Sequence, residues 1–233
     1  MGEVMTELEV QPDEVLEQLS RAARAIRAEE PAGLTAIVTQ ATATIPPAIW
    51  AGLIELENTR LVPRATLGEP PRVLDRLQQE RGAGPCVDAA RQQRVIVVDD
   101  MTTDDRWPEF SAVAVREGVC SMLCVPLWVD NLRLGTLSLY GERTAAFGES
   151  ERRLAAVYGT LAALALADGQ RVAQLTAALE TRDLIGQAKG ILIERLRITP
   201  DAAFDLLSTI SQNSNQKLVS VAERLVNTGE VPG

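Results

Sequence analysis

The sequence contains no histidine among its 233 residues. Histidine is the axial ligand of many haem proteins, a ligand of most catalytic zinc sites, the base in Ser-His and Cys-His catalysis, and the group behind imidazole pH switches. All of these histidine-dependent sites are excluded. We therefore predict no catalytic residue, no metal site and no cofactor, and we expect a protein that is not an enzyme.

Aromatic residues are also scarce, at 3% of the chain, so the cores must rest on Leu, Val, Ile and Ala. No apolar run reaches the ~18 residues that a membrane span requires. Residues 1–14 are acidic and lack the apolar stretch of a signal peptide. These absences predict a cytoplasmic protein with no membrane partner.

Cysteine is rare and basic charge is in deficit. Cys86, Cys120 and Cys124 are odd in number and lack CxxC spacing, which predicts reduced, partly buried thiols. The net charge of −9 argues against general attraction to nucleic acid, because the whole chain does not attract phosphate. Any contact with RNA must therefore come from a local patch.

The length allows one large domain or two small ones. Residues 1–11 are expected to form a loose tail, and residues 12–168 to form a first domain in which helices and strands alternate. The predicted helices are Pro12–Glu30, Leu34–Thr44, Pro71–Arg81, Pro85–Gln93 and Trp107–Glu117. The predicted strands are Ile49–Leu56, Arg60–Leu67, Val95–Val98, Ser121–Val129 and Leu132–Tyr140. Adjacent hairpins of this kind predict an α+β domain with a mainly antiparallel sheet.

Residues 149–197 show helical periodicity almost throughout. Asp168-Gly169 weakens this helix and is interpreted as a hinge or a seam between domains. Val172, Leu175 and Leu179 follow the seam at coiled-coil spacing and predict pairing of two chains. For residues 150–166, packing on the chain's own sheet and pairing with a second chain are equally compatible with the pattern.

Residues 169–233 predict a second domain of three helices. The apolar residues of the first helix share one arc of about 140°. They are Leu184, Ile185, Ala188, Ile191, Leu192 and Leu196. Thr199 and Pro200 should begin a second helix, with Phe204 on its buried face, and Ser211–Asn215 is a polar break before a third. Such short helices must bury one shared core to be stable.

Unusual residues lie just beyond the apolar arc of that first helix. Arg182 and Lys189 project together from one edge, and Gly186 and Gly190 come next along the surface. Glycine lowers helix stability, so its presence twice predicts that a partner helix or an RNA backbone approaches closely.

Several phrases in the first domain resemble GAF domains. They are GPCVDA at 84–89, VVDDM at 97–101, DDRWP at 104–108, VPL at 125–127, and LGTLSLY at 134–140 followed by Ala146-Phe147. The resemblance covers roughly residues 11–168. It implies a twisted antiparallel sheet with helices on one face and a ligand pocket on the other, and a domain that binds a small molecule or dimerises.

Four aromatic residues are candidates to line such a pocket: Trp107, Phe110, Trp128 and Tyr140. Core packing is the alternative explanation for them, and the sequence favours it. The acidic loop over 99–105 is compatible with a cation site, but a solvated loop whose carboxylates cap the helix near Trp107 is favoured.

The window 178–217 closely resembles the ANTAR domain, an RNA-binding module of bacterial antitermination regulators. The matching phrases are RDLIGQAKGIL at 182–192, AAF at 202–204, SQ at 211–212, Asn215, and KL at 217–218. The resemblance covers about residues 174–228. It implies that the protein binds stem-loops in nascent transcripts, usually as a dimer, and prevents transcription termination.

Carried onto this chain, the resemblance assigns RNA contacts to nine residues. They are Arg182, Gly186, Gln187, Lys189, Gly190, Ser211, Gln212, Asn215 and Lys217. Cations would neutralise phosphates, and amide and hydroxyl groups would reach base edges. Without the resemblance, Arg182 and Lys189 are better explained as solvated charges pairing with Glu180 or Glu194, and the polar residues of 211–215 as helix caps.

The sequence thus predicts a GAF domain that senses or dimerises, a connector helix, and an ANTAR domain that binds RNA. A homodimer formed through the connector and the GAF domain is expected, with an unidentified small molecule as a further partner. One alternative is a GAF sensor or dimer scaffold whose helical tail contacts protein. A less favoured one is a thiol-dependent methionine sulfoxide reductase, because Cys86 lies where that group carries a cysteine but Cys120 and Cys124 are out of register.

Overall fold

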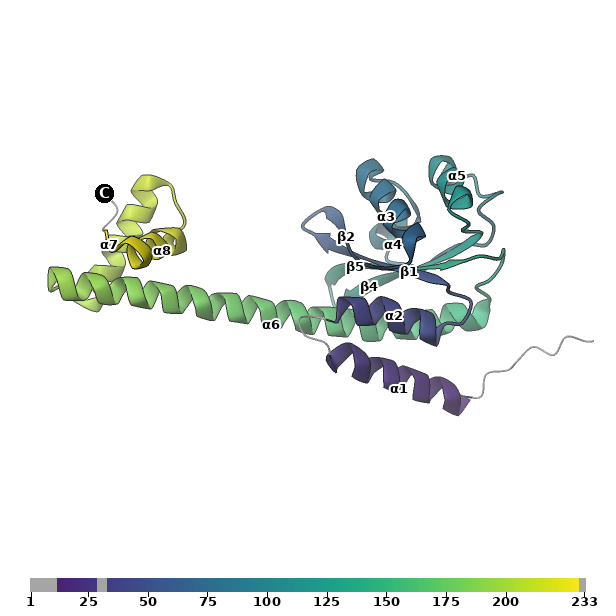
Figure 1. Ribbon diagram of the computed structural model, residues 1–233, viewed down its shortest axis with the longest axis horizontal. Coiled ribbons are helices and arrows are strands. Elements are labelled where there is room, and N and C mark those ends of the chain that lie inside the picture. Colours follow the sequence, from purple (N-terminus) through teal and green to yellow (C-terminus); the bar gives the residue numbers. More distant parts are fainter. Residues whose placement is uncertain (1–11, 29–32, 231–233) are drawn as a thin grey trace, which may run out of the picture. The chain divides into compact units, whose positions relative to one another are not determined.

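The computed structural model describes residues 12–28 and 33–230, and it divides into two compact units. The first unit is Met1–Gly169 and the second is Gln170–Gly233. Helix α6 (Glu149–Leu196) contributes to both (Figure 1). It is continuous through Asp168-Gly169, so the expected weak point does not interrupt the helix. The predicted tail over 1–11 lies outside the described residues.

The described part of the first unit is built on one antiparallel sheet. Its strands are β1 (Trp50–Glu57), β2 (Arg60–Leu67), β3 (Ile96–Val98), β4 (Ser121–Val129) and β5 (Leu132–Gly141), in the order β2-β1-β5-β4-β3. Asn58 and Asp130 have φ near +55°, the conformation that tight hairpin turns require. The expected α+β fold and both predicted hairpins are confirmed.

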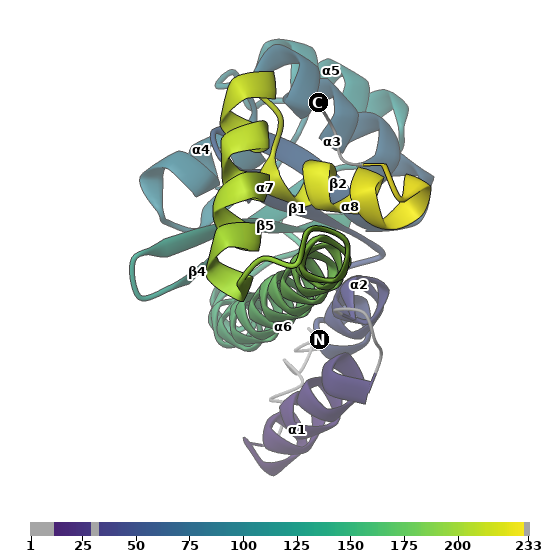
Figure 2. The same ribbon diagram turned by 90° about the vertical axis from the view of Figure 1, so that its left-hand side faces the viewer.

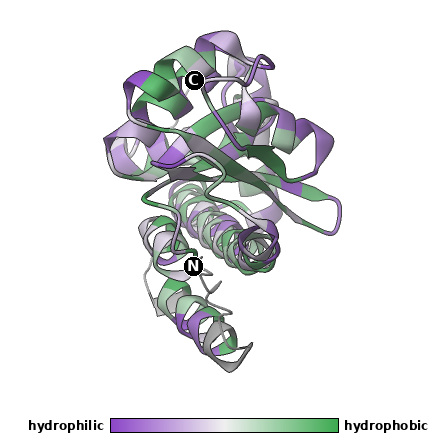
Figure 3. Cartoon of the chain, turned by 90° about the vertical axis from the view of Figure 1, so that its right-hand side faces the viewer, coloured by the Kyte–Doolittle hydropathy of each residue, from purple (hydrophilic) through white to green (hydrophobic). Residues whose placement is uncertain are grey.

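Helices cover both faces of the sheet (Figures 1 and 3). Helix α2 (Leu34–Thr44) and the first part of α6 lie on one face, with α1 (Pro12–Ala28) packed on α2. Helices α3 (Glu69–Arg81), α4 (Pro85–Gln92) and α5 (Pro108–Arg116) lie on the other. The expectation of helices on one face alone was wrong. The first seven residues of β4 are buried without alternation, so both of its faces need cover.

Each helical layer encloses a core of its own. On the α2–α6 side, Leu53, Leu123 and Leu137 pack against Ile37 and Tyr158. The Tyr158 hydroxyl donates a hydrogen bond to the Ile37 carbonyl over 2.6 Å. This bond satisfies a polar group inside the apolar layer and ties α6 to α2.

The core under α3–α5 contains a buried carboxyl group. Tyr140 donates a hydrogen bond to Asp75 Oδ1 over 2.7 Å, and Asp75 Oδ2 has no hydrogen-bond partner among the described residues. Gly52 on β1 lies directly against Oδ2 and leaves no space there for a side chain. Burial raises the pKa of Asp75 to about 7, although the Tyr140 hydrogen bond opposes the shift.

The two prolines of the sheet lie where the missing N–H costs little. Pro63 is on β2, an edge strand whose pairing with β1 shifts register between Leu53 and Ile54. Pro126 is on β4 beyond the stretch Met122–Cys124 that pairs with β3. Both positions avoid the fully paired middle of the sheet.

The second unit is a three-helix bundle formed by the end of α6, α7 (Pro200–Ser214) and α8 (Leu218–Thr228). Figure 2 shows α7 and α8 on the same side of α6. The shared core consists of Ala188, Leu192, Ala203, Leu207, Ile210, Val221, Ala222 and Leu225. Thr199 Oγ1 accepts from the Ala202 N–H at 3.3 Å, so the predicted N-cap is confirmed.

Three expectations for this unit were wrong. Helix α7 continues through Ser214, so the chain leaves the helix only at Asn215 and not from Ser211. Leu196, expected in the core, is exposed because it ends α6. Phe204 is 42% exposed, because it lies at the edge of the α6–α7 contact and not within the core.

The buried Asp75 makes the stability of the first unit depend on pH. Its pKa is higher in the folded chain, about 7, than its ordinary value of 3.8, so the folded state holds the proton more tightly. The contribution of Asp75 to the free energy of unfolding should therefore be greatest below about pH 4 and fall by about 4 kcal/mol as the pH rises to about 7.

Asp75→Asn keeps an acceptor for Tyr140 without the charge, so this fall should disappear. Urea unfolding between pH 4 and 8 measures it, with Asp105→Asn, at an exposed position, as the matched control. An Asp75→Asn protein that loses stability with pH as steeply as the unmutated chain would contradict the assignment.

Candidate nucleic-acid interface

A groove of about 670 Å³ runs along α6 and beside α7 within the second unit. Its lining combines small, apolar and cationic side chains, together with one aromatic ring. The lining residues are Ala177, Ala178, Thr181, Arg182, Ile185, Gly186, Lys189 and Phe204. Three of the nine predicted RNA contacts, Arg182, Gly186 and Lys189, thus share one surface.

The cations of this groove are available to an anion. Arg182 is exposed, and neither Arg182 nor Lys189 forms an ion pair with any described residue. Glu194 pairs instead with Arg197, over 3.6 Å. Lys189 Nζ lies 5.8 Å from the centre of the Phe204 ring, a cation–π distance. The ion pairs expected between Arg182 or Lys189 and Glu180 or Glu194 are therefore not formed among the described residues, although Arg182 is a solvated charge.

Gly186 and Gly190 of α6 are open to solvent. A methyl group added at Gly186 or Gly190 would meet no described atom within 4 Å beyond its own helical turn. Neither glycine is needed for packing inside the bundle. What they provide is a stretch of bare helix backbone that a ligand can reach closely.

Gly190 and Gln187 face a different depression from Gly186. They line a second groove with Ile191, Glu194, Arg195 and Val226, on the α8 side of α6. Arg195 donates a hydrogen bond to the Gly229 carbonyl and so helps to fix the end of α8. The predicted contacts on α6 therefore divide between its two flanks.

The remaining predicted contacts lie at the turn from α7 to α8 and line neither groove. The Ser211 hydroxyl donates to the Gln216 carbonyl over 2.6 Å, and Asn215 ends α7 with φ +52°. Both residues shape the turn, as the capping interpretation predicts. Gln212, Asn215 and Lys217 are exposed.

Sequence reasoning missed Phe204 as part of the site. The helical spacing of Phe204 from Ala203 and Leu207 predicts that it lies on the buried face of α7. Its place at the margin of the apolar face of α7 was the one available signal, because a large ring at that margin extends beyond the core into solvent. An exposed aromatic ring beside a lysine is typical of sites that stack bases.

The four aromatic residues proposed for a ligand pocket do not enclose one. Phe110 and Tyr140 are buried in the core under α3–α5, and Trp107 packs against that core. Trp107 Nε1 donates to Asp88 Oδ2 over 3.2 Å, and the Arg106 guanidinium lies 4.4 Å over its ring. Trp128 is half exposed near the β4–β5 turn, so the structure does not bring it to the other three.

The acidic loop is held by its own hydrogen bonds. Asp100 Oδ1 accepts from the Thr102 N–H and hydroxyl at 2.8 and 2.7 Å, which lowers the pKa of Asp100. Asp104 accepts from the Arg106 N–H at 3.0 Å. No side chain caps the start of α5, so the predicted capping role was wrong. Within 12–28 and 33–230, no three Cys, Asp or Glu side chains group as metal ligands.

The cysteines are free thiols, as predicted. Cys86 and Cys124 are buried with their sulfurs 3.5 Å apart, and Cys86 Sγ lies 2.8 Å from Ser138 Oγ. Burial raises the pKa of Cys124 well above its ordinary value. Cys120 is only partly buried.

Each of the two units matches the model of a known domain family. A GAF domain family model matches residues 9–167, and an ANTAR domain model matches residues 173–226. The chain is a GAF–ANTAR protein. The matched ranges fall on either side of the boundary at Gly169–Gln170. This pairing of domains indicates a regulatory protein that binds RNA. A search of curated proteins found no match.

Solved structures resemble the GAF unit in fold. A free methionine-R-sulfoxide reductase from Neisseria meningitidis, solved with its substrate, has a TM-score of 0.56 at 17% identity, covering 74% of this chain and 99% of its own. The GAF domain of an Acinetobacter phosphoenolpyruvate-protein phosphotransferase has a TM-score of 0.54 at 14% identity, covering 69% and 97%. A GAF domain of the same kind of enzyme from Coxiella burnetii has a TM-score of 0.54 at 18% identity, covering 69% and 96%.

None of the described helices is both long and apolar enough to cross a membrane.

The open glycines lead to a stability prediction. Because a methyl group meets nothing at either position, Gly186→Ala and Gly190→Ala should each stabilise α6 by about 1 kcal/mol. Amide hydrogen exchange in residues 182–196 should slow by about fivefold per substitution where local opening controls it. Faster exchange would mean that these glycines meet packing constraints in the folded bundle.

Proposed function

We propose that this protein binds RNA stem-loops in nascent transcripts through the groove on α6, and that binding prevents transcription termination under the control of the GAF unit. The observation that carries the proposal is the convergence of Arg182, Lys189, Phe204 and Gly186 on one surface of the ANTAR unit. The family assignment gives that surface its ligand class.

The chemistry of the groove suits a loop of single-stranded RNA. A-form helices hide their base edges in a deep, narrow groove, so proteins usually read unpaired loop bases. Phe204 offers a ring on which one base stacks, and Arg182 and Lys189 offer charges to the flanking phosphates. The open backbone at Gly186 lets the sugar–phosphate chain come close.

The α7–α8 turn would add a second set of contacts. Gln212 and Asn215 carry exposed amides, and Lys217 carries an exposed charge with no ion-pair partner among the described residues. The net charge of the chain is −9, so long-range attraction is weak and affinity depends on these local groups. A second binding unit would compensate by raising the effective concentration of the first.

A homodimer would supply that second unit. Val172, Leu175 and Leu179 are between 57% and 59% exposed, and all of residues 171–180 are exposed in the single chain. With Val157 and Leu164, they lie within an arc of about 80° on α6. Pairing of two α6 helices would bury this stripe.

The alternative functions differ in what they require. A tail that contacts protein would use the same groove, with Ile185 and Phe204 as apolar anchors, and would not need Arg182. A methionine sulfoxide reductase would need thiols that a substrate can reach, whereas Cys86 and Cys124 are fully buried. The burial of this pair favours a core role.

Removing the groove cations should weaken RNA binding. Lys189→Ala and Arg182→Ala should each reduce the affinity for a tandem stem-loop RNA about tenfold near physiological salt. Each should also reduce the slope of log affinity against log salt concentration by about 0.7–0.9, the share of one phosphate contact. Fluorescence anisotropy across a salt series measures both quantities.

Arg224→Ala removes the same charge from an exposed position on α8 that lines neither groove, so it should change the affinity little. Gly186→Ala should weaken RNA binding while making the helix more stable. Weaker binding of this variant would therefore reflect the lost close approach of RNA to the helix backbone and not a loss of folding. Equal affinity for all of these proteins, or no binding at any salt concentration, would favour the protein-binding alternative.

Charging the apolar stripe should separate the dimer. The double variant Leu175→Asp, Leu179→Asp should sediment as a monomer at concentrations where the unmutated chain is dimeric, because two carboxylates would face their copies across the seam. Ala173→Asp places a charge on the other side of α6 and should leave the dimer intact. An unmutated chain that sediments as a monomer would contradict the proposed pairing.

A further inference from the structure

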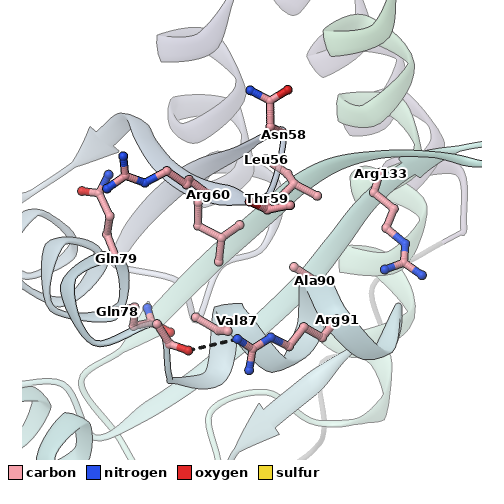
Figure 4. A pocket seen from close by; sticks show the side chains of 12 residues that line it. Leu56, Asn58, Thr59, Arg60, Gln78, Gln79, Val87, Ala90, Arg91 and Arg133 are labelled. Carbon is pink, nitrogen blue, oxygen red and sulfur yellow. Dashed lines mark hydrogen bonds between the residues drawn. The ribbon is translucent and has the colours of Figure 1, made fainter.

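The first unit contains a cavity of about 530 Å³, lined by residues other than those expected for the ligand pocket (Figure 4). It lies between the turn of the β1–β2 hairpin, the end of α3, helix α4 and the start of β5. This volume is within the usual range for small-molecule sites. The four aromatic residues considered above line no part of it.

The charged groups around this cavity all have the same sign. Arg60 from β2, Arg91 from α4 and Arg133 from β5 surround the opening, and no Asp or Glu is among the described residues that line it. None of the three forms an ion pair within the described chain. Arg91 Nη2 donates to the Gly82 carbonyl over 3.3 Å, which ties that side chain to the end of α3. In a chain with net charge −9, this is a local concentration of positive charge.

The floor of the cavity is apolar and fixed. Leu56, Leu61, Val87 and Ala90 supply apolar surface, and Val87 and Ala90 are themselves buried. Gln78 is fully buried at the floor, where its Oε1 accepts from the Cys86 N–H at 2.8 Å and its Nε2 donates to Cys86 Sγ over 3.2 Å. The base of the site is therefore formed before any ligand arrives.

We propose that this cavity binds a small organic anion. The arginines would hold its carboxylate or phosphate ester, and its apolar part would lie against the apolar floor of the cavity. Guanidinium groups bind such oxyanions through paired N–H donors. An inorganic ion would pair with the arginines but leave the apolar floor exposed to water. A neutral apolar molecule would cover the floor but leave the arginines without an anionic partner. The proposal concerns the GAF unit and is independent of RNA binding.

The test uses the intact chain and three probes that separate the two parts of the site. Phenyl phosphate carries both an anion and an apolar body, inorganic phosphate carries only the anion, and phenol carries only the body. Saturation-transfer and chemical-shift NMR titrations give the affinity of each. Phenyl phosphate should bind at least tenfold more tightly than either of the others.

The double variant Arg60→Gln, Arg133→Gln should weaken binding of phenyl phosphate at least tenfold. Arg94→Gln, Arg143→Gln is the matched control, since it removes two exposed arginines of the same unit that do not line the cavity, and it should bind as the unmutated chain does. Thr59→Trp keeps every arginine but fills the mouth beside the hairpin turn, and it should also abolish binding.

Three outcomes would overturn the proposal. The first is equal affinity for phenyl phosphate in the two double variants. The second is inorganic phosphate or phenol binding as tightly as phenyl phosphate. The third is the absence of saturable binding of phenyl phosphate to the unmutated chain. RNA binding is not part of the readout, so none of these outcomes bears on the ANTAR proposal.

Discussion

One helix has to serve two cores. The first part of α6 buries Ala155, Tyr158, Ala162 and Leu166 against the sheet, and its last part buries Ala188 and Leu192 in the three-helix bundle. Between them, residues 171–180 touch neither core and are all exposed. An isolated stretch of helix gains little from propensity alone, so this stretch depends on its packed ends. Its unpartnered leucines are the main reason to propose a second chain.

The proposed RNA surface depends on the same division of α6. The apolar arc of α6 is used for the bundle, which leaves Arg182, Gly186 and Lys189 along its edge. Since neither cation is neutralised by a described neighbour, an acidic protein presents a small positive surface. Glycine at 186 and 190 lowers helix stability without any packing benefit in the bundle. That combination is what a site for a close, charged ligand requires.

Periodicity and turn chemistry were enough to predict the sheet hairpins, the helices and the shared core of the bundle. These features depend on local spacing, as at Asp130-Asn131 and Thr199-Pro200. The exposure of Phe204 and Leu196 was not predictable. Their helical spacing is that of core residues, and only the neighbouring helices, which the spacing does not reveal, decide whether such a side chain is covered. The cavity beside Arg60, Arg91 and Arg133 was missed for a similar reason. Its residues come from four distant segments, and no single segment carries a motif.

The proline on β2 limits how two copies of this protein can meet. An edge strand offers unpaired N–H and C=O groups to any other strand, and sheets can extend from one molecule into the next that way. Pro63 removes one donor from that edge, and the register shift opposite it disturbs the ladder further. Lateral pairing of sheets is thereby disfavoured at β2, and this edge of the GAF sheet is protected against fibre-like growth.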